Sequence, residues 1–362
     1  LTGILPGLGS TSAMALLLPL SFGMEPTTAL IMLAGIYYGS MYGGSTTSIL
    51  VNVPGESSSV MTCLDGYQMA KRGRGGAALA ISATGSFIAG TIGIILLTMF
   101  APPISRAALA FGPPEYLAIS LLGLIVMVML SGSLVKGFMM MLLGVVIGTI
   151  GLDPLTGVNR FTLGVGELSR GIDFVLVAMG VFGLGEVISM LNEGKKKIEM
   201  EKVRMRDLYP NKEEVRRSVP PIIRGSFLGF LCGLIPGPAA VISTFLSYAV
   251  EKKCSRHPEE FGHGAVEGVA GPEAANNAAS SAAMVPLLSL GLPFAPPAAI
   301  LLSGFLVHGI TPGPSLITEH PAVFWGLVAS MYIGNVLLLV INLPFVGVLA
   351  SLLKTPREYL VP

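Results

Sequence analysis

Residues 3–23 read GILPGLGSTSAMALLLPLSFG, an apolar stretch that a Pro-Gly pair interrupts near its start. Proline removes a backbone donor and glycine weakens a helix, so this pair divides the stretch into two short pieces. Broken backbone at membrane depth persists only where protein or a water-filled cavity satisfies its polar groups. Proline beside glycine interrupts three further apolar stretches: STTSILVNVPGESSSV at 45–60, FLGFLCGLIPGPAAVISTFLSYAV at 227–250 and SSAAMVPLLSLGLPFAPPAAI at 280–300.

The composition places these stretches in a membrane. The 362 residues are 52% hydrophobic and only 12% charged, whereas a soluble domain has about 25% charged residues. So little charge cannot cover a water-facing surface, which excludes a water-soluble enzyme. The net charge of +1 provides no field for nucleic acid, and the three cysteines lack metal-ligand spacing. Since a membrane span needs about 20 mostly apolar residues, we expect further spans near 77–101, 115–131, 133–152, 172–192 and 321–350.

The interrupted stretches recur in order along the chain. GILPGLG at 3–9 matches GLIPGPA at 233–239, and NVPG at 52–55 matches GLPF at 291–294. SFIAG, which ends at Gly90, then resembles SMYIG, which ends at Gly334. An ordered set of matches indicates an internal repeat.

The basic residues indicate how the two repeats are oriented. The loop at 65–76 is basic, whereas the preceding loop at 22–28 has no Lys or Arg. In the second half the order reverses, because 251–261 is basic and 308–321 has neither. The positive-inside rule therefore predicts opposite orientations for the two halves. It places every Lys and Arg in the cytoplasm except Arg106, Arg160 and Arg170.

Together these patterns predict an all-α polytopic membrane protein with inverted-topology repeats and broken or re-entrant helical hairpins. We expect a first repeat at 1–101, connecting transmembrane helices at 102–192, a cytoplasmic polar loop at 193–218 and a second repeat at 219–362. Because the chain opens on Leu1 and stops where another apolar segment begins, we also expect a missing N-terminal helix and a truncated C-terminus.

Inverted repeats with broken helices are typical of secondary transporters. A half-helix N-terminus offers unpaired N–H groups to a carboxylate, while hydroxyl and carbonyl oxygens can coordinate Na⁺. The candidate Na⁺ ligands are Thr46, Thr47 and Asn277. The candidate substrate-binding or ion-binding residues at the interrupted stretches are Gly7, Gly9, Ser45, Thr46, Thr47, Asn52, Glu273, Asn276, Asn277 and Pro293.

Structural roles compete with these assignments. Ser and Thr in the GGSTTS run at 43–48 also fit a helix-packing face, on which they bond to carbonyls one turn earlier. Asn276 and Asn277 equally fit hydrogen bonds between helices. Glu273 is harder to explain structurally, because a carboxylate between apolar stretches is costly and usually functional.

Several long motifs resemble the large permease subunit of tripartite tricarboxylate transporters, the TctA family. The resemblance covers essentially the whole chain. The motifs are GILPGLG, ALLLPLSFG, AGIYYGSMYGGSTTSILVNVPGE, DGYQMAKRGRGGAAL, FGPPEYLA, GLIPGPAAVISTFLSYAVEKK, FGHGAVEGVAGPEAANNAA, VPLLSLGLP and TPGPSLITEHP.

The resemblance implies a multi-pass protein of the bacterial inner membrane that imports tricarboxylates or related carboxylates. Import would be coupled to a cation, Na⁺ or H⁺, with no other cofactor. The implied partners are a small membrane subunit and a periplasmic substrate-binding protein. The positions carried over are the Pro6-Gly7 and Pro236-Gly237 loops, Gly43–Thr47, Asn52-Val53-Pro54-Gly55, Glu273 and Asn276-Asn277.

Two positions depart from the family pattern. Pro238 stands in a tip that usually reads PGAGA, and Phe294 replaces a glycine in a usual GIPGS. The Phe294 ring would either narrow the binding cavity or pack against a neighbouring helix.

A membrane channel and an intramembrane enzyme are the alternative functions. A channel also uses re-entrant segments, but the chain has no TVGYG-like filter and a channel does not need inverted charges. An intramembrane enzyme needs a nucleophile or paired acids, and the sequence contains no GxSG, HExxH or GxGD motif.

Overall fold

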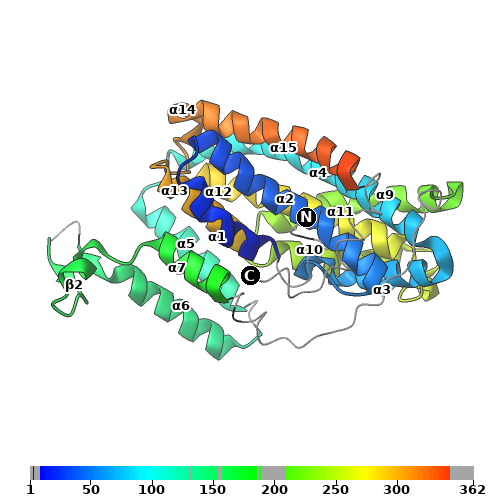
Figure 1. Ribbon diagram of the computed structural model, residues 1–362, viewed down its shortest axis with the longest axis horizontal. Coiled ribbons are helices and arrows are strands. Elements are labelled where there is room, and N and C mark those ends of the chain that lie inside the picture. Colours follow the sequence, from blue (N-terminus) through cyan, green and yellow to red (C-terminus); the bar gives the residue numbers. More distant parts are fainter. Residues whose placement is uncertain are drawn as a thin grey trace.

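A computed structural model describes residues 3, 9–129, 132–153, 157–185, 188 and 209–342. Strand in these residues is confined to a hairpin between β1 (Gly151–Leu152) and β2 (Asn159–Arg160), in which Gly151 pairs with Arg160. The rest of the regular structure is helical, which confirms the predicted all-α class. Figure 1 shows most of the long helices running along the longest axis of the molecule.

The first half begins with a short helix and a long one, α1 (Ser10–Ser21) and α2 (Pro26–Val51). Glu25 caps α2, since its carboxylate accepts the amide of Thr28 at 3.0 Å. After the interruption at 52–56 the chain continues through η2 (Ser57–Ser59), α3 (Val60–Met69), η3 (Ala70–Arg74) and α4 (Gly75–Ala108).

The described middle of the chain contains two apolar helices and three shorter helical segments. They are α5 (Pro113–Met129), α6 (Leu134–Thr149), η4 (Gly166–Arg170), α7 (Phe174–Ala178) and η5 (Met179–Leu184). None of the side chains on α6 is buried in the described structure. An apolar helix with that much exposed surface fits contact with lipid.

The second half starts earlier than the sequence suggests. Helix α9 (Lys212–Gly233) begins within the polar stretch that we assigned to a loop ending at 218. Asn211 and Glu214 form a capping box, which stabilises a helix start even among charged residues. The elements that follow are α10 (Ala239–Cys254), η7 (Pro258–Glu260), α11 (Glu267–Ala282), α12 (Met284–Leu290), α13 (Pro296–Val307), α14 (Leu316–Glu319) and α15 (Pro321–Asn342).

The two halves share an order of elements. In each, a short helix follows the Pro-Gly tip, and the next helical run ends on a residue in the left-handed conformation. These residues are Asn52, with φ 56°, and Gly291, with φ 72°. They occupy matching positions in NVPG and GLPF, and each interruption leads into a further helical segment. The structure therefore gives the predicted repeat a common sequence of elements.

Helix α11 lies at the centre of the packing, because every one of its residues is buried. Glycines of α9 let the two backbones approach closely. A Cβ at Gly225 would lie 2.4 Å from the Gly271 carbonyl oxygen, and one at Gly229 would lie 2.1 Å from that of Ala275. This is the small-residue packing by which membrane helices associate.

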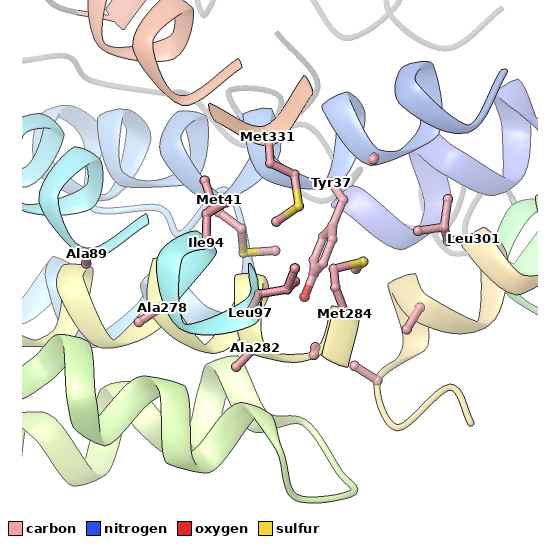
Figure 2. Packing of buried hydrophobic residues seen from close by; sticks show 14 of the residues in the cluster. Tyr37, Met41, Ala89, Ile94, Leu97, Ala278, Ala282, Met284, Leu301 and Met331 are labelled. Atoms are coloured by element: carbon pink, nitrogen blue, oxygen red, sulfur yellow. The ribbon is translucent and has the colours of Figure 1, made fainter. Parts of the chain in front are cut away.

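The apolar core extends from α11 and α12 to α2, α4 and α15. Tyr37 of α2 lies in this core among Met41, Leu97, Met284 and Met331 (Figure 2). The helical stretches Ser57–Ala108 and Pro321–Asn342 are each long and apolar enough to cross a membrane, judged by length and composition.

Candidate functional site

Helix starts from both halves of the chain converge on one cavity of about 160 Å³. Its walls come from Tyr37 and Met41 of α2, Ala279 of α11 and Ala283 directly after α11. The remaining lining residues stand at the beginnings of α1, η2, α10 and α13: Ser10, Thr11, Glu56, Ser57, Ser58, Pro238, Ala239, Ala240, Val241, Ala295, Pro296 and Pro297.

Glu56 brings a carboxylate to this cavity. It directly follows the first-half interruption, and its side chain accepts a hydrogen bond from the backbone amide of Ser10 at the start of α1. Gly9, the N-cap of that helix, has φ 59°, and a Cβ there would lie 3.6 Å from the Glu56 Oε2 atom. Glu56 also caps η2 through a capping box with Ser59.

Gly55 is required where the first-half interruption crosses α2. A Cβ at Gly55 would lie 2.7 Å from the Gly44 Cα atom and 2.8 Å from the Thr47 hydroxyl oxygen. The Gly55 amide donates to the Gly44 carbonyl at 3.4 Å. The close approach of bare backbone fixes the position of the neighbouring Glu56.

The second-half tips meet through the backbone. The Gly237 amide donates to the Phe294 carbonyl at 2.9 Å, which ties the Pro236-Gly237 loop to the interruption at 291–295. Gly237 has φ 134° and is buried, whereas Pro293 beside Phe294 is half-buried. Because Pro296 and Pro297 have no backbone donors, α13 offers fewer free amides to the cavity than α10 does.

The structure distinguishes the two alternatives for Phe294. A Cβ at Gly123 of α5 would lie 3.6 Å from the Phe294 Cε1 atom and 3.7 Å from the Pro236 ring. The Phe294 ring therefore packs against α5, and the residue that lines the cavity is its neighbour Ala295.

Glu273 occupies a second polar position within the helices. It is 1% exposed, and its carboxylate accepts hydrogen bonds from the hydroxyls of Ser45, at 2.5 Å, and Thr62. Ser82 places a further hydroxyl beside it. Within the described residues these partners are neutral, so the carboxylate has no cationic partner. An ionised carboxylate that is buried in this way is costly unless it is protonated, paired with a cation or well hydrogen-bonded.

The two asparagines near Glu273 differ in their contacts. The Asn277 amide donates to Ser86 of α4 at 2.7 Å and to the Glu273 carbonyl at 3.0 Å. These bonds agree with the structural role that the sequence left open. Asn276 is fully buried, and its side-chain oxygen and nitrogen have no hydrogen-bond partner within the part of the chain that the structure describes.

The other predicted site residues lie around the first-half interruption. The Thr47 hydroxyl donates to the Gly44 carbonyl at 3.0 Å, as expected of a packing face, and Thr46 is buried. Asn52 is exposed and Pro54 is half-buried, while Gly7 lies outside the described residues. Among the described hydrogen bonds, none joins Thr46, Thr47 and Asn277, so the Na⁺ site assigned to these three remains a prediction.

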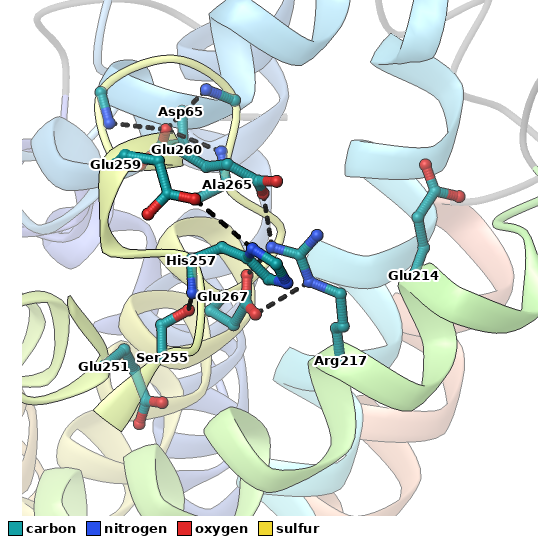
Figure 3. A network of polar contacts seen from close by, with 12 residues as sticks. Asp65, Glu214, Arg217, Glu251, Ser255, His257, Glu259, Glu260, Ala265 and Glu267 are labelled. Atoms are coloured by element: carbon teal, nitrogen blue, oxygen red, sulfur yellow. Dashed lines mark hydrogen bonds and ion pairs between the residues drawn. The ribbon is translucent and has the colours of Figure 1, made fainter. Parts of the chain in front are cut away.

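A polar network gathers segments of both halves at one end of the bundle (Figure 3). Asp65 is buried and accepts the amides of Gly262, Gly264 and Ala265 at 2.7–2.9 Å. Its other oxygen accepts the Tyr248 hydroxyl at 2.8 Å. The first-half segment 65–74 and the second-half segment 257–267 are thereby held together.

Ion pairs from α9 extend this network. Arg217 donates to Glu267 at 2.8 Å and 2.9 Å and also to Glu260, and hydrogen bonding to Glu267 raises the pKa of Arg217. Arg74 pairs with Glu214. Arg106 lies at the opposite end of α4, whose 34 residues span about 50 Å. Which of these two ends faces the cytoplasm remains a prediction.

The sequence reasoning missed Glu56 and Asp65. Glu56 had a usable signal, because it is a carboxylate directly after a Pro-Gly interruption in an apolar stretch. Asp65 lies in a basic loop among other charged residues, and only its contacts to the 262–265 backbone distinguish it.

The fold and the cavity define a class of protein, an all-α membrane protein in which helix starts gather around a mainly apolar cavity whose described lining contains one carboxylate, Glu56. The chain belongs to the tripartite tricarboxylate transporter TctA family, whose model matches residues 1–362. This is a transporter family, and its members are components of a tripartite system. The match confirms the resemblance drawn from the motifs.

Two relatives from Agrobacterium vitis are similar to this chain. The uncharacterized 52.8 kDa protein in the TAR-I ttuC' 3' region is 51% identical over 363 residues, which are 100% of this chain and 72% of that protein. The uncharacterized protein in the TAR-II ttuC' 3' region is 52% identical over 134 residues, 37% of this chain and 55% of that protein. No solved structure matches.

Proposed function

We propose that this chain is the carboxylate-translocating subunit of a cation-coupled importer in the bacterial inner membrane. The observation that carries the proposal is the cavity on which the starts of α1, η2, α10 and α13 converge. Helix starts carry partial positive charge and free amides, which suit the carboxylate groups of a di- or tricarboxylate. No Lys or Arg lines the described cavity, so backbone amides and hydroxyls would hold the substrate.

Glu273 supports the cation coupling. A carboxylate that is buried among hydroxyls has oxygen ligands of the kind that Na⁺ accepts, and it can also carry a proton. Ser45 and Thr62 come from the two sides of the first-half interruption. A cation bound at Glu273 would therefore stabilise one arrangement of the interruption next to the substrate cavity.

The family description supports the proposed partners. A tripartite system implies two further components, which we assign as a small membrane subunit and a periplasmic substrate-binding protein. The substrate-binding protein would deliver the carboxylate to the external side, opposite the Asp65 and Arg217 network.

Uptake into cells tests the proposal. The complete transporter would be expressed with and without its binding protein in a strain that lacks its own carboxylate uptake. We expect uptake of labelled citrate, malate or tartrate that requires the binding protein and a Na⁺ or proton gradient. Flux that ignores the binding protein would instead indicate a channel, and chemical conversion of the probe would indicate an enzyme.

A further inference from the structure

We propose that the Glu56 side chain occupies the carboxylate site when no substrate is bound. A substrate carboxylate displaces this side chain from the start of α1, and Glu56 takes up a proton when it is displaced. The inference rests on the proposed function, because it assumes that the cavity binds a carboxylate. It gives substrate binding a pH dependence of its own, separate from the effect of any cation at Glu273.

The geometry of Glu56 motivates the displacement. Its carboxylate already accepts the Ser10 amide, which is the type of donor that a substrate carboxylate would use. Ser10, Glu56 and Ser57 all line the cavity, so the occupied amide faces the space where the substrate would lie. A substrate carboxylate can bind there only if the Glu56 side chain gives up that amide.

The charges around the cavity motivate the proton. Among its lining residues Glu56 is the one carboxylate, and α1, η2, α10, α11 and α13 contribute neutral groups. From α2 the titratable group is the Tyr37 phenol, which interacts electrostatically with Glu56. Without a cationic side chain in the described lining, a displaced Glu56 and a substrate carboxylate would repel each other. One proton from the aqueous phase, bound to Glu56 for each substrate, removes that repulsion.

The sign of the pH dependence follows from this uptake. If binding takes up one proton, the affinity for the fully ionised substrate falls as pH rises. The fall approaches about tenfold per pH unit once Glu56 is ionised in the free protein. Glu56→Gln keeps a hydrogen-bonding side chain of the same size but cannot take up the proton, so its affinity should lose the one-proton share of the pH dependence, whatever proton binding at Glu273 contributes.

The test measures the half-saturating concentration for uptake between pH 6.5 and 8.5 at constant Na⁺. It uses the whole transporter. The substrate is whichever of citrate, malate and tartrate the parent takes up, and its concentration is given as that of the fully ionised form. The matched control is Glu25→Gln, since Glu25 likewise caps a helix through a backbone amide but is exposed and outside the cavity. Glu25→Gln should keep the pH slope of the parent, whereas the slope of Glu56→Gln should be smaller by up to about tenfold per pH unit, the share of one proton.

A pH slope in Glu56→Gln that equals the slope of the parent would overturn the inference and leave the proposed function standing. No saturable uptake of any of the three carboxylates by the parent would overturn the proposed function itself. If Glu56→Gln fails to reach the membrane, Ser57→Cys in a background without the native cysteines reports the same event. The bound carboxylate should protect the introduced thiol from a thiol reagent less strongly as pH rises. Protection that is equal at all pH values would contradict the inference.

Discussion

Replacement of Gly55 by alanine tests whether the first-half interruption positions the substrate site. The added Cβ would lie 2.1 Å from the Gly3 carbonyl oxygen and 2.7 Å from the Gly44 Cα atom, whereas an ordinary contact is 3.4 Å or more. Both obstacles are backbone atoms, so a change of side-chain rotamer cannot relieve the overlap. The interruption has to move by about 0.7 Å or more relative to α2.

That movement has two expected consequences. Overpacking of this kind typically lowers the free energy of unfolding by about 1–3 kcal/mol. Because Glu56 follows Gly55 directly, the same shift moves the cavity wall, and a displacement near 1 Å can reduce activity by about 100-fold. We therefore expect Gly55→Ala to reduce carboxylate uptake by at least about tenfold while the protein still reaches the membrane, and Gly55→Val to abolish uptake.

The assay compares initial uptake rates at equal amounts of membrane-inserted protein, with thermal unfolding in detergent as the stability measurement. Gly35→Ala is the matched control, because it adds the same methyl group to α2 at a position with open space within 4 Å. Gly35→Ala should behave like the parent in both measurements. Normal uptake by Gly55→Val would refute the reasoning and remove the first-half interruption from the binding site.

Three further predictions concern orientation, coupling and packing. Cysteines placed at 73 and 255 should react with an impermeant thiol reagent from the cytoplasmic side and a cysteine at 313 from the periplasmic side; opposite labelling of 73 and 255 would exclude the inverted repeat. Glu273→Gln should weaken the Na⁺ dependence of uptake by at least about tenfold, within the range of ordinary coupling energies, and an unchanged Na⁺ titration would exclude Glu273 as the cation site. Phe294→Gly should lower stability by about 1–2 kcal/mol, below the loss for a fully buried ring, and leave the order of preferred substrates unchanged; a changed order would place the ring in the cavity.

The sequence alone was sufficient for the class of protein and for the three predicted helix interruptions that lie within the described residues. Low charge and long apolar stretches exclude a soluble fold, and proline and glycine weaken a helix locally. The local signal is not absolute, because Gly271 and Pro272 lie within α11. The charge pattern predicts that 65–74 and 257–267 lie on the same side of the membrane, but their contact through Asp65 was found only in the tertiary structure. The sequence analysis did not predict the start of α9 at Lys212, because the many charged residues of this segment indicated a loop despite its capping box.

Only the tertiary structure decided which residues meet. Glu56 and the Ser10 amide are 46 positions apart, and Ser45 and Glu273 are 228 apart. Nothing in the local sequence specifies these partners. The first pairing depends on how the start of α1 lies against the start of η2, and the second on how α2 and α11 pack. The same holds for Phe294, whose ring lies against α5 although its neighbour Ala295 lines the cavity. Local chemistry determined the elements and their ends, and the packing of distant small residues such as Gly229 against Ala275 determined the site.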